Sequence, residues 1–468
     1  GRKLPVPAAH RPTMTPSTLP PELADALHQR FGSRFSRGDS VRLQHGRDES
    51  PHGPLPPDAV VFAASTAELA AAMTLCAAHG VPVIPYGVGS SVEGHVLAPH
   101  GGVSLDLSGM NRVLEIHAED GDATVEAGVT RKQLNDALKG SGLFFPIDPG
   151  ADATLGGMAA TRASGTNAVR YGTMRDNVMA TTAVLADGRI IRTGSRARKS
   201  SAGYDLTRLL VGSEGTLAII TELTVRLYPL PEAVSAAVCA FPSIDAAVRT
   251  SIQTIQLGVP VARIELVDAL TITAINAYSK TSLAVAPTLF FEFHGSPASV
   301  EEQARTVQAI AGDQGGLDFA WATRPEDRSR LWQARHDAYF ACLQLRPGCR
   351  CVSTDVCVPI SRLADCIAAT AKDIAQTELP VPILGHVGDG NFHLVIPILP
   401  DRPDEQEQAA WLRGRLVERA LAMGGTCTGE HGVGLGKRQY LAAEHGAEAV
   451  AVMRSLKAAL DPGNLLNP

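Results

Sequence analysis

Short apolar runs alternate with amphipathic stretches between residues 53 and 230, and this alternation predicts a domain that mixes strands and helices. The predicted strands lie at 60–63, 81–85, 103–107, 113–116, 123–126, 178–185, 190–193 and 217–227. Asp187-Gly188 separates two of these runs and is typical of a β-hairpin turn. Strands and helices around one core favour an α+β fold.

Two helices in this region carry recognisable start signals. Ser65 precedes an apolar-periodic stretch that runs to His79, and Glu68 follows Ser65 at the spacing of a capping box. Thr130 opens a second helix, which we expect to end near Lys139 because two glycines follow.

Pro229-Leu-Pro231 is the clearest boundary along the chain. Beyond it, strands are predicted at 236–241, 261–266, 288–294 and 317–321. Ser243 opens a helix to Leu257, and Ser299-x-x-Glu302 has the capping-box spacing that would open another. Strand–helix–strand repeats of this kind indicate a ferredoxin-like α/β sandwich.

The predicted organisation has four regions. They are an N-terminal arm and helix at 1–52, one domain at 53–230, a second at 231–420 and a C-terminal segment at 421–468. Further helices are expected at 22–31, 404–423 and 447–460. Residues 1–20 are rich in proline and polar residues, which is typical of a disordered arm and not of a secretory signal.

The stretch His386-Val-Gly-Asp-Gly-Asn-Phe-His393 lies between two apolar runs and predicts a strand, a tight turn and a strand. With the turn centred on Asp389-Gly390, the two histidines stand directly opposite each other. Directly opposed residues share a face of the hairpin, with Cβ atoms ~5 Å apart. Two imidazoles at that separation can hold one divalent metal.

Glu430 and His431 follow about forty residues later, between glycines. Glu430 is a candidate third ligand, which leaves coordination positions open for water or substrate. His431, beside it, is a candidate general base. The alternative is that each histidine is a hydrogen-bonded structural residue, and the Gly-rich surroundings favour the functional interpretation because glycine permits close approach of a ligand.

Three tracts of small residues lie in the first domain: 85–94, 148–167 and 212–220. Their glycines and hydroxyls expose backbone N–H groups of the kind that cradle a pyrophosphate. The first tract lacks the glycine spacing of a Rossmann fingerprint and no helix is predicted after it, so taken alone it is equally consistent with a simple turn. Together the three tracts predict a large nucleotide cofactor.

Composition narrows the class of protein. The chain has 468 residues, 45 % hydrophobic and 19 % charged, which is ordinary for a globular enzyme of two or three domains. The net charge of -6 argues against a nucleic-acid or anionic-membrane partner, and no apolar run is long enough for a transmembrane helix.

The cysteines are Cys76, Cys239, Cys342, Cys349, Cys351, Cys357, Cys366 and Cys427. Several lie in apolar patterns that suit buried thiols, and no Cys-x-x-Cys spacing supports a zinc or iron–sulfur site. A reducing compartment is the expectation.

Five motifs in order resemble one family. They are Pro85-x-Gly-x-Gly-Ser-Ser, Gly212-Ser-Glu-Gly-Thr, Gly385-His-Val-Gly-Asp-Gly-Asn-x-His393, Gly429-Glu-His-Gly-x-Gly and Asp461-Pro-x-Asn-Leu-Leu-Asn467-Pro. Across about 55–468 the chain resembles the flavin-dependent 2-hydroxy-acid dehydrogenases of the vanillyl-alcohol-oxidase type. Within them it is similar to the branch of D-lactate dehydrogenase and of the flavin-binding subunit of glycolate oxidase.

The resemblance implies the fold and the cofactor. The first domain would be an FAD-binding domain of the vanillyl-alcohol-oxidase (PCMH) type, and the second a substrate or cap domain. FAD would be held without a covalent bond. The implied cofactor-binding residues are Pro85, Tyr86, Gly87, Val88, Gly89, Ser90, Ser91, Gly94, Pro149, Thr154, Gly156, Gly157, Ser164, Gly165, Thr166, Asn167, Glu214, Gly215, Ile219, Ile220 and Asn467.

The resemblance also implies roles at the reacting centre. Zinc or manganese would bind His386, His393 and Glu430, and His431 would be the base. Arg335 and Asn391 would bind substrate, with Arg335 pairing with the substrate carboxylate. From sequence alone, a surface helix arginine is the favoured interpretation of Arg335.

The implied reaction is oxidation of a 2-hydroxy acid to the 2-keto acid by hydride transfer to flavin N5. Relatives that oxidise D-2-hydroxyglutarate carry a lysine for the second carboxylate, in the strand that corresponds to Ser353-Thr354-Asp355-Val356. Thr354 and Asp355 occupy those positions here, so a second carboxylate would be unpaired or repelled. D-lactate or another short D-2-hydroxy acid is therefore expected.

Alternatives stay open: the flavin subunit of a glycolate oxidase complex, a D-2-hydroxyglutarate dehydrogenase, a flavin-dependent transferase that makes ether lipids, and a metal-dependent hydrolase in which the Gly-rich loops are only turns. The expected partners are the hydroxy acid and an electron acceptor, namely a cytochrome, a quinone or an electron-transfer protein. A homodimer is expected. The expected location is the cytoplasm, with peripheral association at the inner membrane as the alternative.

Overall fold

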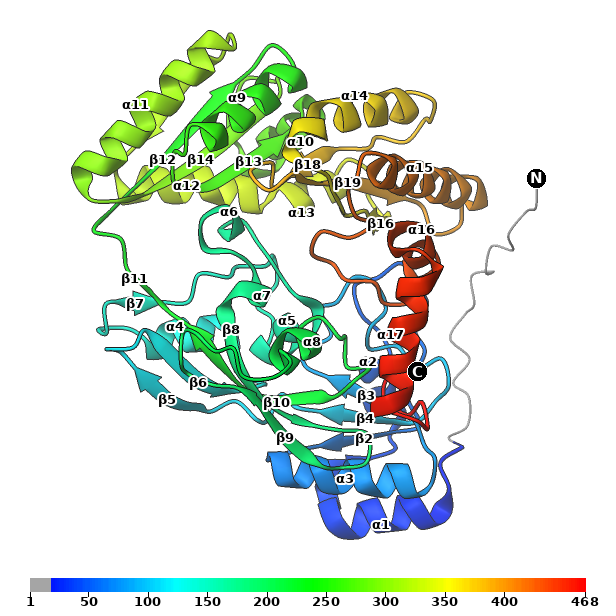
Figure 1. Cartoon of the computed structure of the whole chain (residues 1–468). Helices are drawn as coiled ribbons and strands as arrows, with labels where there is room; N and C mark the ends of the chain where they lie inside the picture. Colours follow the sequence, from blue (N-terminus) through cyan, green and yellow to red (C-terminus); the bar gives the residue numbers. More distant parts are fainter. Residues whose placement is uncertain (1–17) are drawn as a thin grey trace.

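The structure is a computed structural model that describes residues 18–468, so most of the predicted N-terminal arm lies outside the described residues. Two bodies stack one above the other in Figure 1, and the C-terminal helices run along one side of both. We call residues 18–230 the N-terminal part, residues 231–422 the central part and residues 423–468 the C-terminal segment.

The N-terminal part contains a four-stranded sheet in which three strands are parallel. The order is β1 (Phe35–Ser36), β2 (Ala59–Phe62), β4 (Val103–Asp106), β3 (Val83–Tyr86). Helices α1 (Pro21–Phe31) and α3 (Thr66–Ala78) contribute to its apolar core. The predicted cap at Ser65 is confirmed, because its side chain accepts a hydrogen bond from the backbone N–H of Glu68.

A second sheet of the N-terminal part is antiparallel and has five strands. The order is β5 (Val113–His117), β6 (Asp122–Glu126), β10 (Ile219–Arg226), β8 (Val178–Val184), β9 (Ile190–Gly194). The predicted hairpin through Asp187-Gly188 is confirmed as β8–β9. Two-residue strands β7 (Leu143–Phe144) and β11 (Tyr228–Pro229) pair beside it, and β11 leads into the central part.

The remaining helices of the N-terminal part are short and connect these sheets. They are α2 (Asp39–His45), α4 (Arg131–Ala137), α5 (Leu155–Thr161), α6 (Ala168–Tyr171), α7 (Met174–Asn177) and α8 (Leu206–Leu210). The predicted capping of α4 by Thr130 is confirmed, with Gln133 completing the box. The pattern did not predict α5, because glycine and alanine in its sequence give no apolar stripe.

The central part is built on one antiparallel sheet. Its order is β15 (Leu317–Ala322), β12 (Ala233–Ala240), β14 (Thr288–Gly295), β13 (Val261–Val267), β18 (Ile383–Gly385), β19 (Asn391–Ile398), β16 (Arg350–Ser353). β17 (Val356–Cys357) also pairs with β19. The first four strands have the order 4-1-3-2 of a ferredoxin-like unit, so this prediction is confirmed.

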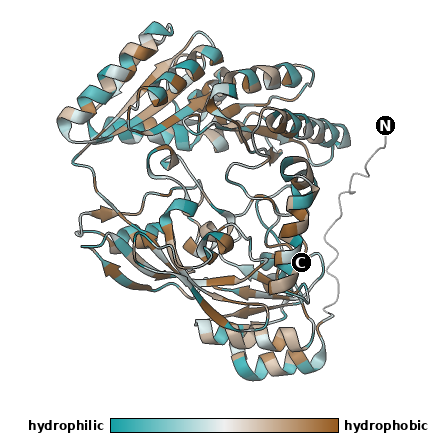
Figure 2. Cartoon of the chain, in the orientation of Figure 1, coloured by the Kyte–Doolittle hydropathy of each residue, from teal (hydrophilic) through white to brown (hydrophobic). Residues whose placement is uncertain are grey.

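Alternate residues of this sheet enter two separate cores. Phe291 and Phe293 lie in the core with α9 (Ile244–Gln256), α11 (Pro297–Asp313), α14 (Leu363–Ile374) and α15 (Pro403–Ala422). Phe290 enters the core with α10 (Ala269–Ser279), α12 (Pro325–His336) and α13 (Ala338–Leu343). The alternation follows from the two-residue period of a strand. Figure 2 shows hydrophobic strands and largely hydrophilic outer faces on the covering helices.

One predicted cap in the central part is wrong. Helix α11 is capped by Ser296, whose side chain accepts from the backbone N–H of Ser299, so Ser299 lies inside the helix. Pro297 occupies the first helical position, where its fixed φ and missing N–H suit a helix start. The pattern also failed to predict α10, α13 and α14, and it gave no bounds for α12, the helix that carries Arg335.

The C-terminal segment returns to the N-terminal part. Helices α16 (Leu441–His445) and α17 (Ala447–Leu460) precede a parallel bridge between Leu466 and Val83 of β3. None of the helices within residues 18–468 is long and apolar enough to cross a membrane.

Candidate active site

The predicted histidine hairpin exists, but its register differs from the prediction. β18 and β19 pair Ile383 with Leu394 and Leu384 with His393, so His386 and His393 are not directly opposed. The direct opposition was wrong because the turn is wider than two residues: Asp389 N donates to His386 O. A shift of two residues keeps a side chain on the same face. The two rings therefore still meet, with centroids 5.4 Å apart.

Glu430 of the C-terminal segment completes a group of three side chains. Its Oε1 lies 3.1 Å from His386 Nε2 and 3.3 Å from His393 Nε2. One ligand atom from each residue lies within 4.8 Å of the other two. The structure thus brings together all three residues of the predicted metal cluster.

The other ring nitrogen of each histidine is hydrogen bonded. His386 Nδ1 lies 2.7 Å from Glu265 Oε1, and His393 Nδ1 lies 2.9 Å from Thr354 O. These contacts direct both Nε2 atoms toward Glu430, as outer partners orient histidines in metal sites. Two imidazole nitrogens and a carboxylate oxygen in this arrangement fit a divalent metal such as zinc or manganese.

Burial and charge act in opposite directions on this group. Burial lowers the pKa of His386, but the carboxylates of Glu265 and Glu430 outweigh it and raise that pKa well above its usual value. Burial raises the pKa of Glu430, but His386 and His393 bring it below its usual value. The cluster is therefore a compact set of coupled charges.

Arg335 is buried, so the interpretation as a surface helix arginine is wrong. It lies on α12 with 7 % of its surface exposed, and its Nη2 donates to Glu265 Oε2 over 2.6 Å. Its Nε is buried and has no hydrogen-bond partner within the described part of the chain. An unsatisfied buried donor of this kind is costly unless a ligand supplies the acceptor.

Glu265 connects Arg335 to the metal cluster. Its carboxylate has no appreciable exposure and contacts Arg335 with one oxygen and His386 with the other. Sequence reasoning did not predict this residue, because it lies 121 positions from His386 within an ordinary apolar strand.

His431 stacks on His393. The ring centroids are 5.0 Å apart and the planes are inclined by 14°. The pKa of His431 is lowered to about 4, chiefly by burial; His393 and Lys437 act in the same direction, and the carboxylates of Asp355 and Glu430 oppose them. The imidazole is therefore neutral near pH 7, and its buried Nδ1 has no partner among the described residues. A neutral imidazole with a free nitrogen can accept a proton.

Asn391 is buried at the start of β19. Its Nδ2 donates to Asp355 Oδ1 over 2.7 Å and to Val356 O over 2.8 Å. Only its Oδ1 has no partner within the described residues, so any substrate contact would use this oxygen. Its predicted substrate-binding role stays a prediction.

The glycine-rich tracts of the N-terminal part approach one another closely. A Cβ on Gly87 would lie 2.5 Å from Thr154 Oγ1, and one on Gly215 would lie 2.9 Å from Pro85 Cγ. Parts of all three tracts therefore converge, and glycine is required at these contacts.

Several predicted cofactor-binding side chains contact their own chain. Glu214 accepts from Val433 N and Gly434 N, and Asn467 donates to Glu214 O. Ser91 Oγ donates to Asp48, and Thr166 Oγ1 donates to Asp148. The other predicted cofactor-binding residues lie in the same tracts or, for Ile219 and Ile220, in β10.

Two family profiles together match most of the chain. Residues 57–194 match the family described as "FAD binding domain", and residues 230–468 match "FAD linked oxidases, C-terminal domain". The chain belongs to the FAD-linked oxidase family.

Several named proteins are similar to this chain over most of its length. It is 56 % identical to "Probable D-lactate dehydrogenase, mitochondrial" of Danio rerio, over 92 % of this chain and 88 % of that protein. It is 45 % identical to "D-lactate dehydrogenase [cytochrome], mitochondrial" of Arabidopsis thaliana, over 96 % and 80 %. Identity to "Glycolate oxidase subunit GlcD" of Bacillus subtilis is 36 %, over 93 % of each.

Solved structures share this FAD-linked oxidase fold. p-Cresol methylhydroxylase with bound substrate has a TM-score of 0.78 at 18 % identity, covering 97 % of both chains. Alkyldihydroxyacetonephosphate synthase has a TM-score of 0.76 at 20 % identity, covering 97 % of this chain and 87 % of that one. The predicted fold, a PCMH-type FAD-binding domain with a ferredoxin-like second domain, is confirmed.

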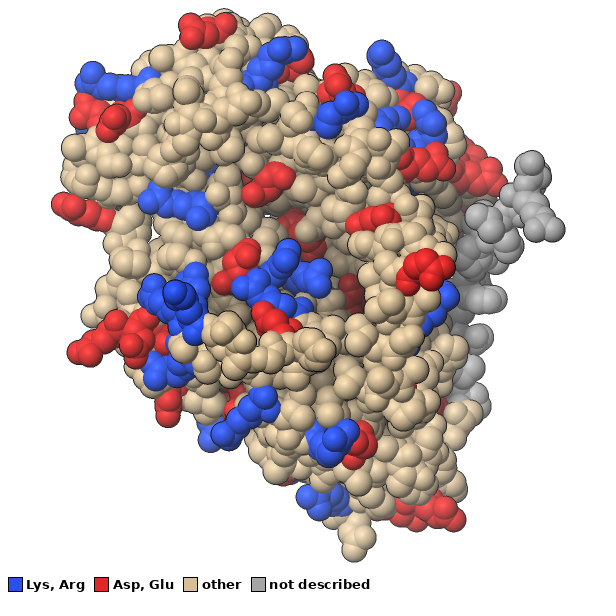
Figure 3. Space-filling view, in the orientation of Figure 1, with Lys and Arg blue, Asp and Glu red and all other residues tan. Residues whose placement is uncertain are grey.

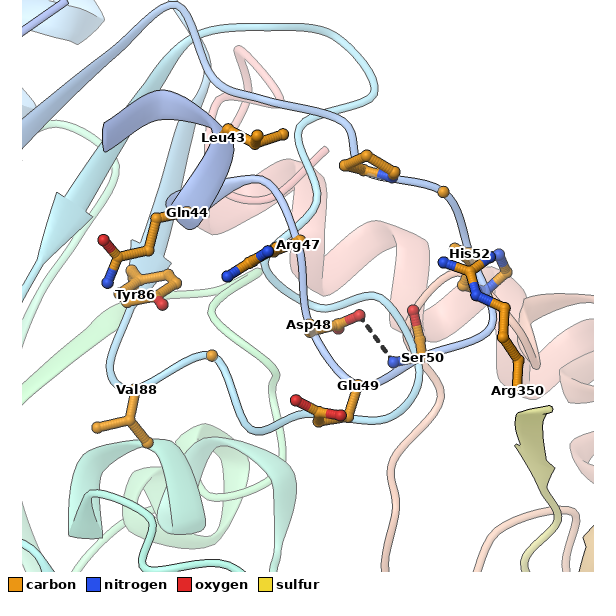
Figure 4. A pocket seen from close by; sticks show the side chains of 13 residues that line it. Leu43, Gln44, Arg47, Asp48, Glu49, Ser50, His52, Tyr86, Val88 and Arg350 are labelled. Atoms are coloured by element: carbon orange, nitrogen blue, oxygen red, sulfur yellow. Dashed lines mark hydrogen bonds between the residues drawn. The ribbon is translucent and has the colours of Figure 1, made fainter. Parts of the chain in front are cut away.

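A cavity adjoins the first glycine-rich tract of this FAD-linked oxidase. Its volume is about 830 Å³, and Tyr86, Val88 and Gly89 line one side of it. The segment 43–54 and Arg350 line the rest, and Figure 4 shows Gln44 near Tyr86, with His52 and Arg350 across the space. A cavity of this size beside a glycine-rich tract fits part of a dinucleotide.

Sequence reasoning missed the segment 43–54 as part of this cavity. The segment has no glycine-rich pattern, and its contact with the tract at 85–94 is long-range: Gly94 N donates to Asp48 Oδ2 over 2.9 Å. Figure 3 shows a hollow between the N-terminal and central parts, with acidic and basic side chains around it.

Proposed function

We propose that this FAD-linked oxidase is a D-lactate dehydrogenase, which oxidises D-lactate to the 2-keto acid and passes the electrons to an external acceptor. The observation that carries the proposal is the group of His386, His393, Glu430, His431 and Arg335, of which His393 and Arg335 are buried and the others partly buried. It combines a metal-type donor set, a neutral imidazole and an unsatisfied guanidinium donor. The names of the relatives support the substrate.

The residues divide the work of binding and proton transfer. Arg335 Nε, which is free, holds the substrate carboxylate, as guanidinium groups commonly do. His431 accepts the proton of the substrate hydroxyl. A divalent metal bound by His386, His393 and Glu430 would supply polarisation of that hydroxyl. Bound FAD would supply a hydride acceptor for the α-hydrogen.

We propose non-covalent FAD binding by the N-terminal part. The tracts at 85–94, 148–167 and 212–220 would hold it chiefly through backbone N–H groups, because many of their side chains already contact the chain itself. The domain limits of the sequence prediction, 53–230 and 231–420, are retained in this proposal.

The structure supports a short monocarboxylate substrate. Thr354 is buried, and its Oγ1 accepts from Leu394 N. The Asp355 carboxylate is surrounded by donors of its own chain. Neither residue offers a cation to a second carboxylate, which disfavours D-2-hydroxyglutarate. Because Thr354 is buried and hydrogen bonded, Thr354→Lys would disrupt the structure and would be a poor test of specificity.

The decisive experiment mixes the anaerobic purified protein separately with D-lactate, L-lactate, glycolate and D-2-hydroxyglutarate and follows flavin absorbance. Bleaching by D-lactate alone establishes cofactor, reaction and handedness together. A flavin band that no substrate bleaches would contradict the proposal and favour the non-redox transferase class. A colourless protein would favour the metal-dependent hydrolase.

A second candidate is the flavin subunit of a glycolate oxidase complex, which the similarity to the Bacillus subtilis protein favours. Bleaching by glycolate, together with co-purification of an iron–sulfur partner, would support it. For the acceptor we propose a cytochrome, as in the name of the Arabidopsis thaliana relative, with a quinone as the alternative. Homodimer formation and the cytoplasmic location stay predictions, and the relatives named above as D-lactate dehydrogenases are also named as mitochondrial.

A further inference from the structure

Asp355 lies at the centre of the candidate active site without facing any open space. It follows β16 and precedes β17, and its side chain has no exposed surface. Burial raises its pKa, but His431, Lys437 and His393 outweigh this effect and hold the pKa well below its usual value. Asp355 is therefore a fully buried carboxylate that stays negatively charged.

One oxygen of Asp355 holds the segment that carries Glu430 and His431. Oδ2 accepts from Thr428 Oγ1 over 2.8 Å, from Glu430 N over 2.8 Å and from His431 N over 2.9 Å. Two consecutive backbone N–H groups thus point at a single atom, which fixes the orientation of the peptide between them. Backbone hydrogen bonds to a charged acceptor are stronger than those to neutral ones.

The other oxygen of Asp355 reaches the strand that carries His393. Oδ1 accepts from Asn391 Nδ2, and Asn391 lies two residues before His393 on β19. Gly429 is drawn against the same amide, since a Cβ there would lie 2.2 Å from Asn391 Nδ2. A single carboxylate therefore links the Glu430 segment to the β19 strand.

A buried lysine completes the surroundings of Asp355. Lys437 Nζ lies 3.7 Å from Asp355 Oδ2, 3.5 Å from Asp355 O and 3.0 Å from Glu93 Oε1. This lysine balances the negative charge, which would otherwise be costly inside the protein. It also ties the central part to the tract at 85–94 of the N-terminal part.

We propose that Asp355 is a positioning residue for the reaction. It sets the Glu430 carboxylate against the Nε2 atoms of His386 and His393, and it holds the His431 ring parallel to His393. The expected effect of Asp355 on catalysis rests on the proposed function. Its expected effect on metal binding does not depend on that function. Asp355 is not a candidate for substrate contact, because its side chain is fully buried within the protein.

A residue with only a structural role would change stability and leave the site intact. The variant Asp355→Asn distinguishes a positioning role from a purely structural one. It preserves the shape of the side chain, but it presents an NH₂ group to N–H donors on one side. The expected result is retained FAD, zinc or manganese affinity lower by about 10- to 100-fold, and a similar fall in the flavin reduction rate at saturating D-lactate. Metal affinity is measured by titration followed by mass spectrometry.

The matched control is Asp373→Asn. Asp373 is a buried aspartate of the same part that pairs with Arg419 and contacts none of the site residues. This variant is expected to lose stability and keep wild-type metal affinity and reduction rate. If Asp355→Asn behaves like this control, the positioning role is overturned.

A second variant, Thr428→Val, serves if Asp355→Asn does not fold. It removes one donor to Oδ2 and is expected to weaken metal binding in the same direction but less. Wild-type metal affinity in this variant would overturn the inference. If the wild-type protein binds metal but D-lactate does not reduce its flavin, the proposed function fails while the metal titrations still decide the role of Asp355.

Discussion

The two sides of the candidate active site are each organised around one buried carboxylate, and the two carboxylates act differently. Glu265, on β13, contacts two cationic side chains, Arg335 and His386. Asp355 contacts mainly backbone and neutral side-chain donors of the segment 428–431 and of Asn391. One side is thus arranged by charge pairing and the other by the shape of a loop.

This difference indicates which property of the site depends on each carboxylate. Loss of a charge partner leaves buried cations uncompensated, which affects both stability and substrate binding. Loss of a side-chain carboxylate that accepts hydrogen bonds from backbone N–H groups frees a loop, which affects the placement of the side chains of that loop. Substitutions on the two sides of the site should therefore change different measured constants.

The largest effect is expected on the loop side, for His431→Gln. Removal of the proton acceptor should lower the anaerobic flavin reduction rate by about 10²- to 10⁴-fold, the usual contribution of a general base. FAD and metal content should be unchanged. Stopped-flow absorbance with D-lactate measures the rate, and His445→Gln, at a half-exposed histidine of α16, is the control. A wild-type rate would remove His431 from the mechanism.

The next largest effect is expected on the charge side, for Glu265→Gln. Arg335 and His386 would lose their common anion, so we expect about 3–5 kcal/mol less stability and metal affinity lower by about 10- to 100-fold. The apparent KM for D-lactate should also change, since Arg335 is no longer held. Denaturant unfolding and metal titration test this. An unchanged KM would break the contrast with Asp355, for which metal affinity and the reduction rate are expected to fall without a change in KM.

A smaller effect is expected for Arg335→Lys. The change keeps the charge but removes the planar guanidinium group. In the wild-type protein this group contacts Glu265 through Nη2 and has Nε available for the substrate. We therefore expect KM for D-lactate to rise about 10- to 100-fold. Metal content should stay at the wild-type level. Arg330→Lys, at an exposed arginine of the same helix, is the control. Equal KM values in the two variants would contradict the substrate-binding role.

The smallest effect is expected for a partly exposed ion pair, Arg34 and Glu68, in the N-terminal part. Hydrogen bonding to Arg34 is the largest cause that lowers the pKa of Glu68 to about 2. Glu68→Gln should cost less than about 1 kcal/mol at pH 7 and leave activity unchanged. Since the folded pKa is depressed, the contribution of Glu68 is present above about pH 4.5 and is lost as pH falls toward 2. Unfolding curves of both proteins across this range test the sign.

Local signals in the sequence predicted the sheets, the hairpin and the gathering of His386, His393 and Glu430. They did not predict the register, because hairpin register depends on a turn whose hydrogen bond, from Asp389 N to His386 O, is not encoded in residue types alone. The cap of α11 was misplaced by three residues for a similar reason, since Ser296 and Ser299 are equivalent in type.

The two organising carboxylates could not be predicted from the sequence. Glu265 meets His386 across 121 positions, and Asp355 meets Glu430 across 75. Glu265 lies within strand β13 and Asp355 between the short strands β16 and β17, and in both places a single acidic residue is indistinguishable from one on a solvated face. The burial of Arg335 depends on the same long-range pairing, which explains why the helix sequence favoured an exposed side chain.

The return of the C-terminal segment to β3 has a consequence for the order in which the site is completed during synthesis. His386 and His393 leave the ribosome before Glu430, and the Leu466 bridge to Val83 forms later still. Because domains generally fold in order from the N-terminus, the first sheet must wait for its last contact. A nascent chain would therefore have two of the three metal-type side chains in place, and would gain the third only as the segment closes over both parts.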